Sequence, residues 1–374
     1  MTGALAPPLP SNLPGSPIIA GDPIRVMLCD DSLVIRHALS RMLEAEPGIR
    51  ITARVANGEL ALAEIRRQPV DVVVLDIEMP VMDGLTVLPQ LLRADPGVRV
   101  IMASTLTTRG ADVAMRALRL GAADYIPKPT AAAIDDDRFR QELLAKIRGQ
   151  ARLRRRDILP QRNSLTAASP SKLSLRPASR TRPALLAIGS STGGPQALFT
   201  LIQGLGRSVP VPVVLTQHMP RSFTPILAEH ITRIGALRCA EAQDGEMLQA
   251  GAIYLAPGDR HFCVDAAGGG FRARLTDDPP ENFCRPSVDP MLRTANKAAG
   301  GRILIAMLTG MGHDGLAGTR AVIEAGGTAV AQDEASSVVW GMPGAIAQAG
   351  LCHAILPLDH LAPKIRDLLQ MRPA

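Results

Sequence analysis

Side chains that can bind a metal ion or a phosphate group follow several short apolar runs in the first half of the chain. They are Asp30, Asp31, Asp76, Ser104 and Lys128. If the runs are neighbouring strands, three carboxylates meet at one sheet edge and repel one another unless a divalent cation lies between them. Oxygen ligands of this kind favour Mg²⁺. One carboxylate can then attack a phosphoryl donor, while Lys128 and the Ser104 hydroxyl contact the added phosphate oxygens.

The second half places a serine in a glycine-rich turn. Gly189-x-Ser191-x-Gly193 follows an apolar run, and Pro195 suits the first turn of a helix. This is the spacing of a nucleophile elbow, in which a serine lies at a helix N-terminus where free amides favour developing negative charge. We therefore predict Ser191 as a nucleophile. The oxyanion would be held by amides near Thr192 and by the turn that contains Met311.

A serine hydroxyl needs a base, and the base needs an orienting group. His218 follows the apolar run 211–216, and Asp314 lies in the turn after the run 303–308. If these runs are parallel strands, all three side chains come from strand carboxyl ends. The chain order Ser, His, Asp differs from the orders of α/β-hydrolases, chymotrypsin and subtilisin, which indicates a separate fold family with convergent chemistry.

Other interpretations of the same residues stay open. A glycine-rich turn can also hold a nucleotide phosphate, although no acidic residue follows at the ribose-binding spacing and no lysine closes the loop. His313 neighbours Asp314 and is interpreted as a solvent-facing side chain. We interpret His261 and Asp289 as cleft wall or substrate contacts.

The elements that must position these residues are predicted from apolar runs alternating with helical periodicity. In the first half the expected strands are 24–29, 51–56, 70–75, 98–103 and 124–126, which predict a doubly wound parallel α/β sheet. In the second half they are 185–188, 211–216, 253–256 and 303–308, a second α/β domain, with a hairpin or loop at 268–270. The predicted organisation is a tail at 1–22, one domain at 23–148, a linker at 149–182 and a second domain at 183–374.

Charge and aromatic content bear on the class of partner. The net charge is +6, but residues 148–182 hold ten basic side chains and one acid, so they carry +9 and the rest of the chain carries +6 − 9 = −3. Aromatic residues are 2%, too few for a base-stacking platform. We expect no nucleic-acid partner.

The five cysteines form no CxxC pair and no metal-ligand spacing with the seven histidines, so we interpret them as buried free thiols. No charged segment precedes apolar residues at the N-terminus, and no run of about eighteen apolar residues occurs. We expect a cytoplasmic protein without membrane insertion.

The first half closely resembles the response-regulator receiver family over residues 24–148, including the run DIEMPVMDG at 76–84. The resemblance implies that Asp76 accepts phosphate from a histidine kinase. It also implies that Asp31, Asp76 and the backbone carbonyl of Glu78 hold Mg²⁺, with Asp30 acting through a water molecule. The loop after Ser104 is longer than in single-domain receivers.

The second half resembles the catalytic domain of the chemotaxis protein-glutamate methylesterases. Five segments carry the match in order: IGSSTGG at 188–194, TQHMP at 216–220, PGDRH at 257–261, RPSVD at 285–289 and LTGMGHDG at 308–315. Ser190 and His313 stand where the family would have Ala and Asn, and neither substitution changes the triad.

This resemblance implies a phosphorylation-regulated hydrolase that demethylates glutamate 5-O-methyl esters on methyl-accepting chemoreceptors, releases methanol and deamidates receptor glutamines. The esterase itself would need no cofactor. A receiver-linked nucleotide-binding module without hydrolase activity remains the alternative. A receiver-controlled DNA-binding regulator is disfavoured, because the second half has no helix-turn-helix pattern.

Overall fold

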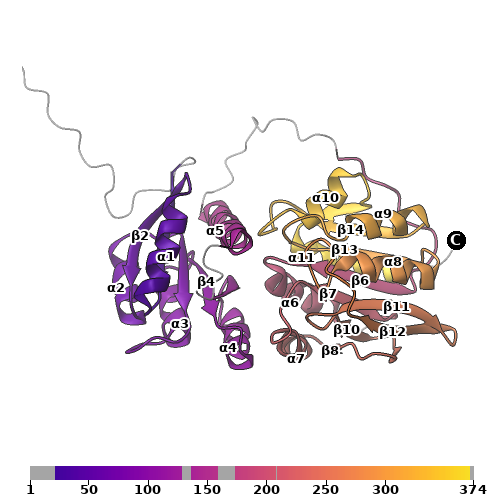
Figure 1. Ribbon diagram of the computed structural model, residues 1–374. Coiled ribbons are helices and arrows are strands. Elements are labelled where there is room, and N and C mark those ends of the chain that lie inside the picture. Colours follow the sequence, from indigo (N-terminus) through magenta and orange to yellow (C-terminus); the bar gives the residue numbers. More distant parts are fainter. Residues whose placement is uncertain (1–21, 129–135, 159–172, 208, 371–374) are drawn as a thin grey trace, which may run out of the picture.

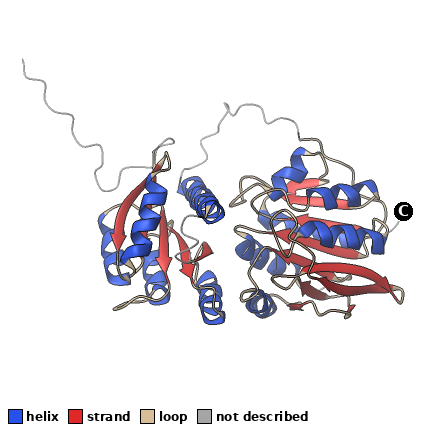
Figure 2. Ribbon diagram, viewed as in Figure 1, coloured by secondary structure: helices blue, strands red, loops and turns tan. Residues whose placement is uncertain are grey.

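The computed structural model describes residues 22–128, 136–158, 173–207 and 209–370. Residues 1–21 of the predicted tail, the middle of the predicted linker and Pro129 lie outside these residues. Two α/β domains are seen, one formed by the first half of the chain and one by the second (Figure 1). Helices lie against the sheets of both domains (Figure 2).

The first domain is a five-stranded parallel sheet in the order β2-β1-β3-β4-β5. Its strands are β1 Ile24–Cys29, β2 Ile49–Val55, β3 Val72–Asp76, β4 Arg99–Ser104 and β5 Asp124–Pro127. Its helices are α1 Leu33–Glu44, α2 Gly58–Arg67, α3 Gly84–Ala94, α4 Thr108–Arg119 and α5 Asp137–Ile158. The predicted doubly wound parallel sheet is confirmed, with each predicted strand within two residues of the observed one at either end.

Polar side chains begin four of these helices where each chain segment leaves the sheet edge. Each of these side chains accepts a hydrogen bond from a backbone amide in the first turn of the helix that follows; they are Ser32, Asn57, Asp83 and Thr107. The central strand β3 is buried along its whole length, as expected of a strand covered by helices on both faces. These caps and buried strands fix where the functional loops start.

Helix α5 runs past the boundary that the sequence predicted. Residues 149–158, expected to be linker, continue the helix. Ile147 and Ala151, spaced one turn apart, are buried against the sheet, and Arg154 is 5% exposed. The error came from treating 149–182 as one composition: the proline that excludes a helix comes only at Pro160, and the arginines before it are good helix formers.

An ion-pair cluster fixes the end of α5 on the sheet. Asp71 is fully buried and bonds to Arg25 (2.8 Å), while Arg154 contacts both Asp71 (3.3 Å) and Asp95 (2.7 Å). Burial alone would raise the pKa of Asp71, but hydrogen bonds and charge from Arg25, with Arg154 adding to them, outweigh it and lower the pKa.

The second domain has a seven-stranded parallel sheet in the order β15-β14-β13-β6-β7-β10-β8 and a three-stranded antiparallel sheet β11-β12-β9. Its strands are β6 Leu185–Ser190, β7 Val213–Gln217, β8 Arg238–Glu241, β9 Met247–Leu248, β10 Ala252–Leu255, β11 His261–Ala267, β12 Gly270–Thr276, β13 Ile303–Met307, β14 Thr328–Gln332 and β15 Ala354–Leu356. Its helices are α6 Gly194–Leu205, α7 Thr224–Ile234, α8 Val288–Ala299, α9 Leu316–Glu324, α10 Met342–Gln348 and α11 Leu358–Gln370.

Four predicted strands of this domain, β6, β7, β10 and β13, form the middle of the large sheet together with β14, and residues 268–270 turn the β11–β12 hairpin. Strands β8, β9, β14 and β15 were not predicted. β6 lies between β7 and β13, so the chain that leaves each of these three strands emerges at the same edge.

The first domain lies against the second through α4, α5 and β5 (Figure 1), and α5 bonds to the second domain where Arg152 donates to the Ser337 carbonyl (2.5 Å). Tyr125 of β5 stacks on Phe223 with ring centroids 4.8 Å apart. Gln196 of α6 donates to the carbonyls of Leu118 (2.7 Å) and Ala122 (2.6 Å). This part of the interface thus combines one aromatic stack with hydrogen bonds to the C-terminal end of α4.

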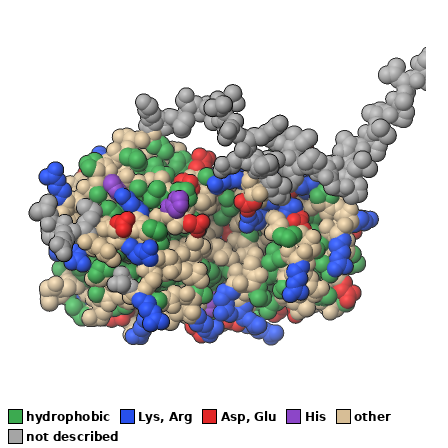
Figure 3. Space-filling model, turned by 180° about the vertical axis from the view of Figure 1, so that it is seen from behind, with side chains coloured by type: hydrophobic (Ala, Val, Ile, Leu, Met, Phe, Trp, Pro, Cys, Tyr) green, Lys and Arg blue, Asp and Glu red, His purple; other side chains and the backbone are tan. Residues whose placement is uncertain are grey.

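No helix in the described ranges has the length and apolarity needed to cross a membrane. Figure 3 shows the surface from behind: Lys and Arg side chains gather along the lower edge of this view, with acidic side chains among them. Neighbouring acids therefore partly neutralise the basic side chains visible on that face.

Asp71→Ala should lower the free energy of unfolding of the first domain by about 3 kcal/mol, because the buried guanidinium of Arg154 then lacks one of its carboxylate partners. Asp157→Ala removes the exposed ion pair to Arg99 and should cost less than about 1 kcal/mol. Urea unfolding measures both. Since folding lowers the pKa of Asp71, its contribution should be present above pH 3.8 and disappear as the pH falls through the lowered value. Equal losses for the two variants would contradict the prediction.

Candidate active site and acidic cluster of the first domain

The predicted acidic residues of the receiver lie together at the carboxyl edge of its sheet. Oxygens of Asp30, Asp31 and Asp76 lie within 4.8 Å of one another. Asp30 and Asp76 are almost fully buried, and Asp31 is exposed. Three carboxylates this close, one of them open to solvent, fit a hard divalent cation bound through oxygen. The residues present therefore suit the predicted Mg²⁺.

Lys128 is the charge partner of this cluster. Its ammonium lies 2.5 Å from Asp76 Oδ2 and 3.0 Å from Asp30 Oδ2. Burial raises the pKa of Asp76 to about 6, against the lowering effect of Lys128 and together with repulsion from Asp30. Lys128 thus lies where it can contact a group added to Asp76.

Two other predicted residues of this site, Ser104 and Glu78, lie beside the acidic cluster rather than within it. Ser104 is the last residue of β4, and its hydroxyl donates to the carbonyl of Gly110 (2.7 Å) in the first turn of α4. The Glu78 amide donates to Asp76 Oδ1 (3.2 Å), which places Glu78 beside the carboxylate. Both residues border the cluster.

In the second domain, Ser191 stands on the turn between β6 and α6. Its amide donates to Thr309 O (3.0 Å), and its carbonyl accepts from Gln217 Nε2 (3.0 Å). Gly193 has φ +75°, a conformation that glycine adopts without strain. A Cβ on Gly310 would lie 3.0 Å from Ser191 Cβ, so this glycine permits the close approach of the β13 turn to the elbow.

His218 and Asp314 form a direct pair at the same edge. His218 Nε2 lies 2.7 Å from Asp314 Oδ2. Burial by itself would lower the pKa of His218, but the bonds to Asp314 and to Cys284 outweigh it and raise the pKa to about 10. Burial likewise opposes ionisation of Asp314, yet the contact with His218 brings its pKa down to about 2.

Asp314 is 2% exposed and accepts hydrogen bonds from several donors besides His218. These further donors are the backbone amides of Val288 (2.7 Å) and Asp289 (3.2 Å), the Ser287 hydroxyl (2.7 Å) and Asn282 Nδ2 (2.9 Å). A carboxylate with this many donors stays ionised when buried. The start of α8 and the loop before it therefore position the partner of the histidine.

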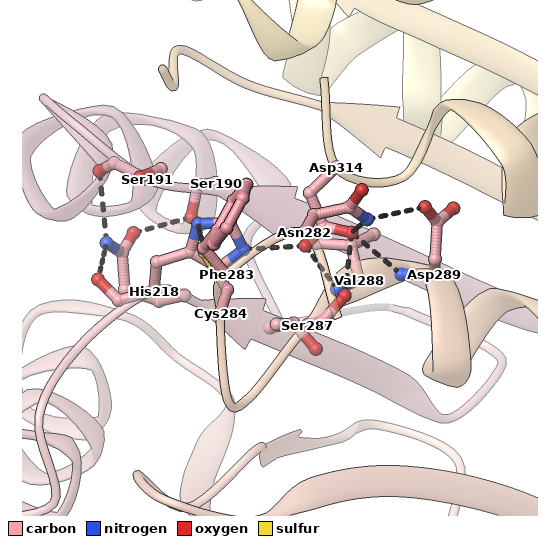
Figure 4. A network of polar contacts seen from close by, with 12 residues as sticks. Ser190, Ser191, His218, Asn282, Phe283, Cys284, Ser287, Val288, Asp289 and Asp314 are labelled. Carbon is pink, nitrogen blue, oxygen red and sulfur yellow. Dashed lines mark hydrogen bonds and ion pairs between the residues drawn. The ribbon is translucent and has the colours of Figure 1, made fainter. Parts of the chain in front are cut away.

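A tight turn at residues 281–284, hereafter the 281–284 turn, covers the pair. Glu281 and Cys284 exchange two backbone hydrogen bonds, and Asn282 and Phe283 have φ of 53° and 61°. Asn282 joins Asp314 to Asp289, and Phe283 is 81% exposed. Cys284 Sγ lies 3.3 Å from His218 Nδ1. Figure 4 shows the His218 ring between Cys284 and the Asp314 carboxylate.

The structure brings His218 and Asp314 together but does not bond Ser191 to them. Among the described residues, the Ser191 hydroxyl makes no hydrogen bond with His218, whose Nδ1 faces Cys284 instead (Figure 4). The Thr192 carbonyl accepts from Thr309 Oγ1 (2.9 Å), so Thr192 and the turn that contains Met311 are adjacent. Their two amides form no hydrogen bond within the described part of the chain.

The remaining predicted neighbours have separate roles. His261 is buried, with Nε2 near Pro279 O (3.1 Å) and Nδ1 accepting from Ser287 N (3.2 Å), so it supports the loop. His313 is exposed. Asp289 accepts from Gly318 N (2.6 Å) as well as Asn282. Ser190 donates to Gln217 Oε1 (2.7 Å) and is fully buried.

Sequence reasoning missed Asn282 and Cys284. Four of the five cysteines are buried free thiols as predicted, but Cys284 is partly exposed and contacts the histidine. Its position directly before the RPSVD segment was the available signal. Only the turn geometry shows that its sulfur lies on the ring.

The receiver reaches this site at two points. Asp124 Oδ2 accepts from the amide of Gly193 in the elbow (3.2 Å) and from Lys146 of α5 (3.1 Å). Arg138 at the start of α5 donates to the carbonyl of Phe283 in the 281–284 turn (2.9 Å). The elbow and the turn, which carry Ser191 and Cys284, are thus both bonded to the receiver.

Comparison with known proteins assigns each half of the chain to a protein family. Residues 26–146 match the response regulator receiver domain, and residues 186–365 match the CheB methylesterase family. The chain is 52% identical over 380 residues to protein-glutamate methylesterase/protein-glutamine glutaminase 1 of Paramagnetospirillum magneticum, covering 96% of this chain and 99% of that protein. It is 50% identical to the corresponding enzyme of the group 2 operon of Rhodospirillum centenum, covering 96% and 99%.

Among solved structures, the catalytic domain of the CheB methylesterase from Thermotoga maritima is 37% identical. The match covers 50% of this chain and 100% of that chain, with a TM-score of 0.49.

Asp314→Asn should lower the pKa of His218 clearly below about 10, because the carboxylate is lost while the burial remains. NMR titration of the histidine ring signals measures this. Asp289→Asn is the matched control, since Asp289 lies in the same cluster without touching the ring. A His218 pKa that moves equally in both variants would show that Asp314 is not its main partner.

Proposed function

The chain belongs to the CheB methylesterase family, joined to a receiver domain, and on that premise we propose that Ser191, His218 and Asp314 carry its hydrolytic chemistry. As a member of this family it is a protein-glutamate methylesterase and protein-glutamine glutaminase of chemotaxis, regulated by its receiver. The observation that supports the three residues best is the His218–Asp314 pair beside the turn of Ser191.

In the proposed first step the Ser191 oxygen bonds to the acyl carbon of a glutamate methyl ester, and the neutral form of His218, which the raised pKa of about 10 makes the minor form at neutral pH, takes the hydroxyl proton. Because Nε2 is bound to Asp314, Nδ1 is the nitrogen that accepts this proton. Asp314 holds the ring orientation and stabilises the positive charge that forms. The amides of Thr192 and Met311 lie in adjacent turns and are proposed to bind the oxyanion.

The tetrahedral intermediate then collapses. The carbon–methoxy bond breaks, His218 returns its proton to the departing oxygen, and methanol leaves an acyl-enzyme. Water, deprotonated by the same histidine, attacks the acyl carbon; the bond to the Ser191 oxygen then breaks, His218 returns its proton to that oxygen, and the glutamate leaves. A glutamine substrate follows the same course with ammonia as leaving group, where protonation by His218 matters more.

The receiver implies a histidine kinase as phosphoryl donor, and membership of the family implies chemoreceptors as substrate. We propose Asp76 as the acceptor and methyl-accepting receptor helices as the substrate. Asp31, Asp76 and the Glu78 carbonyl would hold Mg²⁺, with Asp30 acting through water. Bound there, Mg²⁺ would supply positive charge that offsets the carboxylates and the phosphoryl group. Lys128 and Ser104 would contact the phosphate oxygens.

Membership of a hydrolase family favours esterase chemistry over a nucleotide-binding role for the glycine turn. A fluorophosphonate probe separates the two roles directly. Labelling at Ser191 is expected of the hydrolase, and an unlabelled protein that binds nucleotide would support the other.

Ser191→Ala should abolish methanol release from methylated receptor while leaving the fold intact, because it removes one small hydroxyl that makes no hydrogen bond to any other described residue. Ser190→Ala is the matched control: it loses the bond to Gln217 but should keep substantial activity. The measurement is methanol release by full-length protein. If the two variants exchange these outcomes, Ser190 is the nucleophile.

Asp76→Asn should abolish phosphorylation by a histidine kinase or a small phosphoryl donor while basal methanol release persists. The reason is that the acidic cluster and the serine lie in different domains. Phosphorylation is followed by mass spectrometry and the esterase by methanol release. A correctly folded variant that has lost both would show that Asp76 is needed for hydrolysis itself.

A further inference from the structure

The ring nitrogen of His218 that does not contact Asp314 is in contact with Cys284, a residue outside the proposed triad. Nε2 is bound to Asp314, so Nδ1 is the nitrogen left for Ser191. Cys284 Sγ lies 3.3 Å from Nδ1. An imidazole nitrogen has one site for a hydrogen bond, either a lone pair or a proton. Cys284 and the Ser191 hydroxyl therefore compete for the same atom, and in this structure the thiol holds it.

The position of Cys284 is fixed by its turn rather than by its own side chain. The paired backbone bonds between Glu281 and Cys284 close the turn, and Asn282 anchors it to Asp314 and Asp289 (Figure 4). Phe283 is a non-glycine residue at positive φ, a conformation that persists only where surrounding contacts enforce it. A change in those contacts can therefore move the sulfur.

One of those contacts comes from the receiver. Arg138 of α5 donates to the Phe283 carbonyl at 2.9 Å, and it is the hydrogen bond between the receiver and the 281–284 turn in the described residues. Both Arg138 and Phe283 are exposed, so the bond is easily broken when the domains shift. The remaining ties of the turn lie within the second domain.

We propose that Cys284 is a positioning residue that holds His218 away from Ser191 while the receiver is docked, and that Arg138 keeps the 281–284 turn in this place. Docking of the receiver then acts on the catalytic base itself. Separation of the domains frees the Phe283 carbonyl, lets the turn relax and gives Nδ1 to the serine hydroxyl. The proposal rests on the triad proposed above.

The test compares methanol release by unphosphorylated full-length protein with that of Cys284→Ala, over a range of pH. The variant should raise kcat about fivefold, the size of one ordinary hydrogen bond, with little change in KM. The contact with Cys284 is one of the interactions that raise the pKa of His218, the other being Asp314. Its loss should therefore move the acid limb of the kcat profile to lower pH.

Cys284→Ser checks that the effect is the hydrogen bond rather than packing. Its hydroxyl can still bond to Nδ1, so this variant should remain near the wild-type rate. The rate of fluorophosphonate labelling at Ser191 gives a second readout that needs no receptor, and it should rise in Cys284→Ala alone. An unchanged or lower kcat in Cys284→Ala, or a change confined to KM, would overturn the proposal in favour of a wall that contacts substrate.

Arg138→Ala tests the part played by the receiver. It should raise kcat in the same direction as Cys284→Ala, and the two changes together should not add. Arg148→Ala is the matched control, an arginine of the same helix whose ion pair to Glu46 stays within the receiver. If Arg138→Ala behaves like Arg148→Ala, the receiver does not hold the turn. If Ser191→Ala still releases methanol, the triad itself is wrong.

Discussion

The buried charge of Asp314 is the interaction on which the arrangement of the second domain's site depends. A carboxylate that is 2% exposed must be surrounded by donors, and here they come from three separate stretches of chain. His218 follows β7, the Ser287 hydroxyl and two amides come from the start of α8, and Asn282 comes from the loop before it. Satisfying one charge therefore fixes the imidazole, the helix start and the 281–284 turn together.

The two domains use the same feature of parallel sheets for different chemistry. Strand carboxyl ends gather polar side chains at one edge, which in the receiver are carboxylates and a lysine and in the second domain a serine, a histidine and an aspartate. The receiver binds to the second domain close to this edge. Asp124 accepts from the elbow amide of Gly193, and Arg138 donates to the turn of Cys284. The receiver is thus bonded to the loops that carry the proposed reactive groups.

Buried charge also explains why the receiver ends where it does. Asp71 forms ion pairs with Arg25, Arg154 and Arg155, so the arginine-rich end of α5 belongs to the folded domain. The interface with the second domain contains a further buried pair, Lys146 with Asp124, whose carboxylate is the one that meets Gly193. Helix α5 therefore connects the receiver sheet to the elbow.

The sequence by itself determined the two α/β domains, the strands that form the middle of each sheet and the residues at their ends. This was possible because apolar periodicity is local and because strand carboxyl ends in a parallel sheet must converge. Composition misled at residues 149–158, where arginines interpreted as linker are held in α5 by ion pairs with residues far away in sequence. Cys284 was interpreted as an ordinary buried thiol, since nothing in its neighbours states which ring it touches. Only the tertiary structure decided which partner occupies Nδ1 of His218, because that depends on a turn at 281–284 and a strand end at 217 that meet through folding alone.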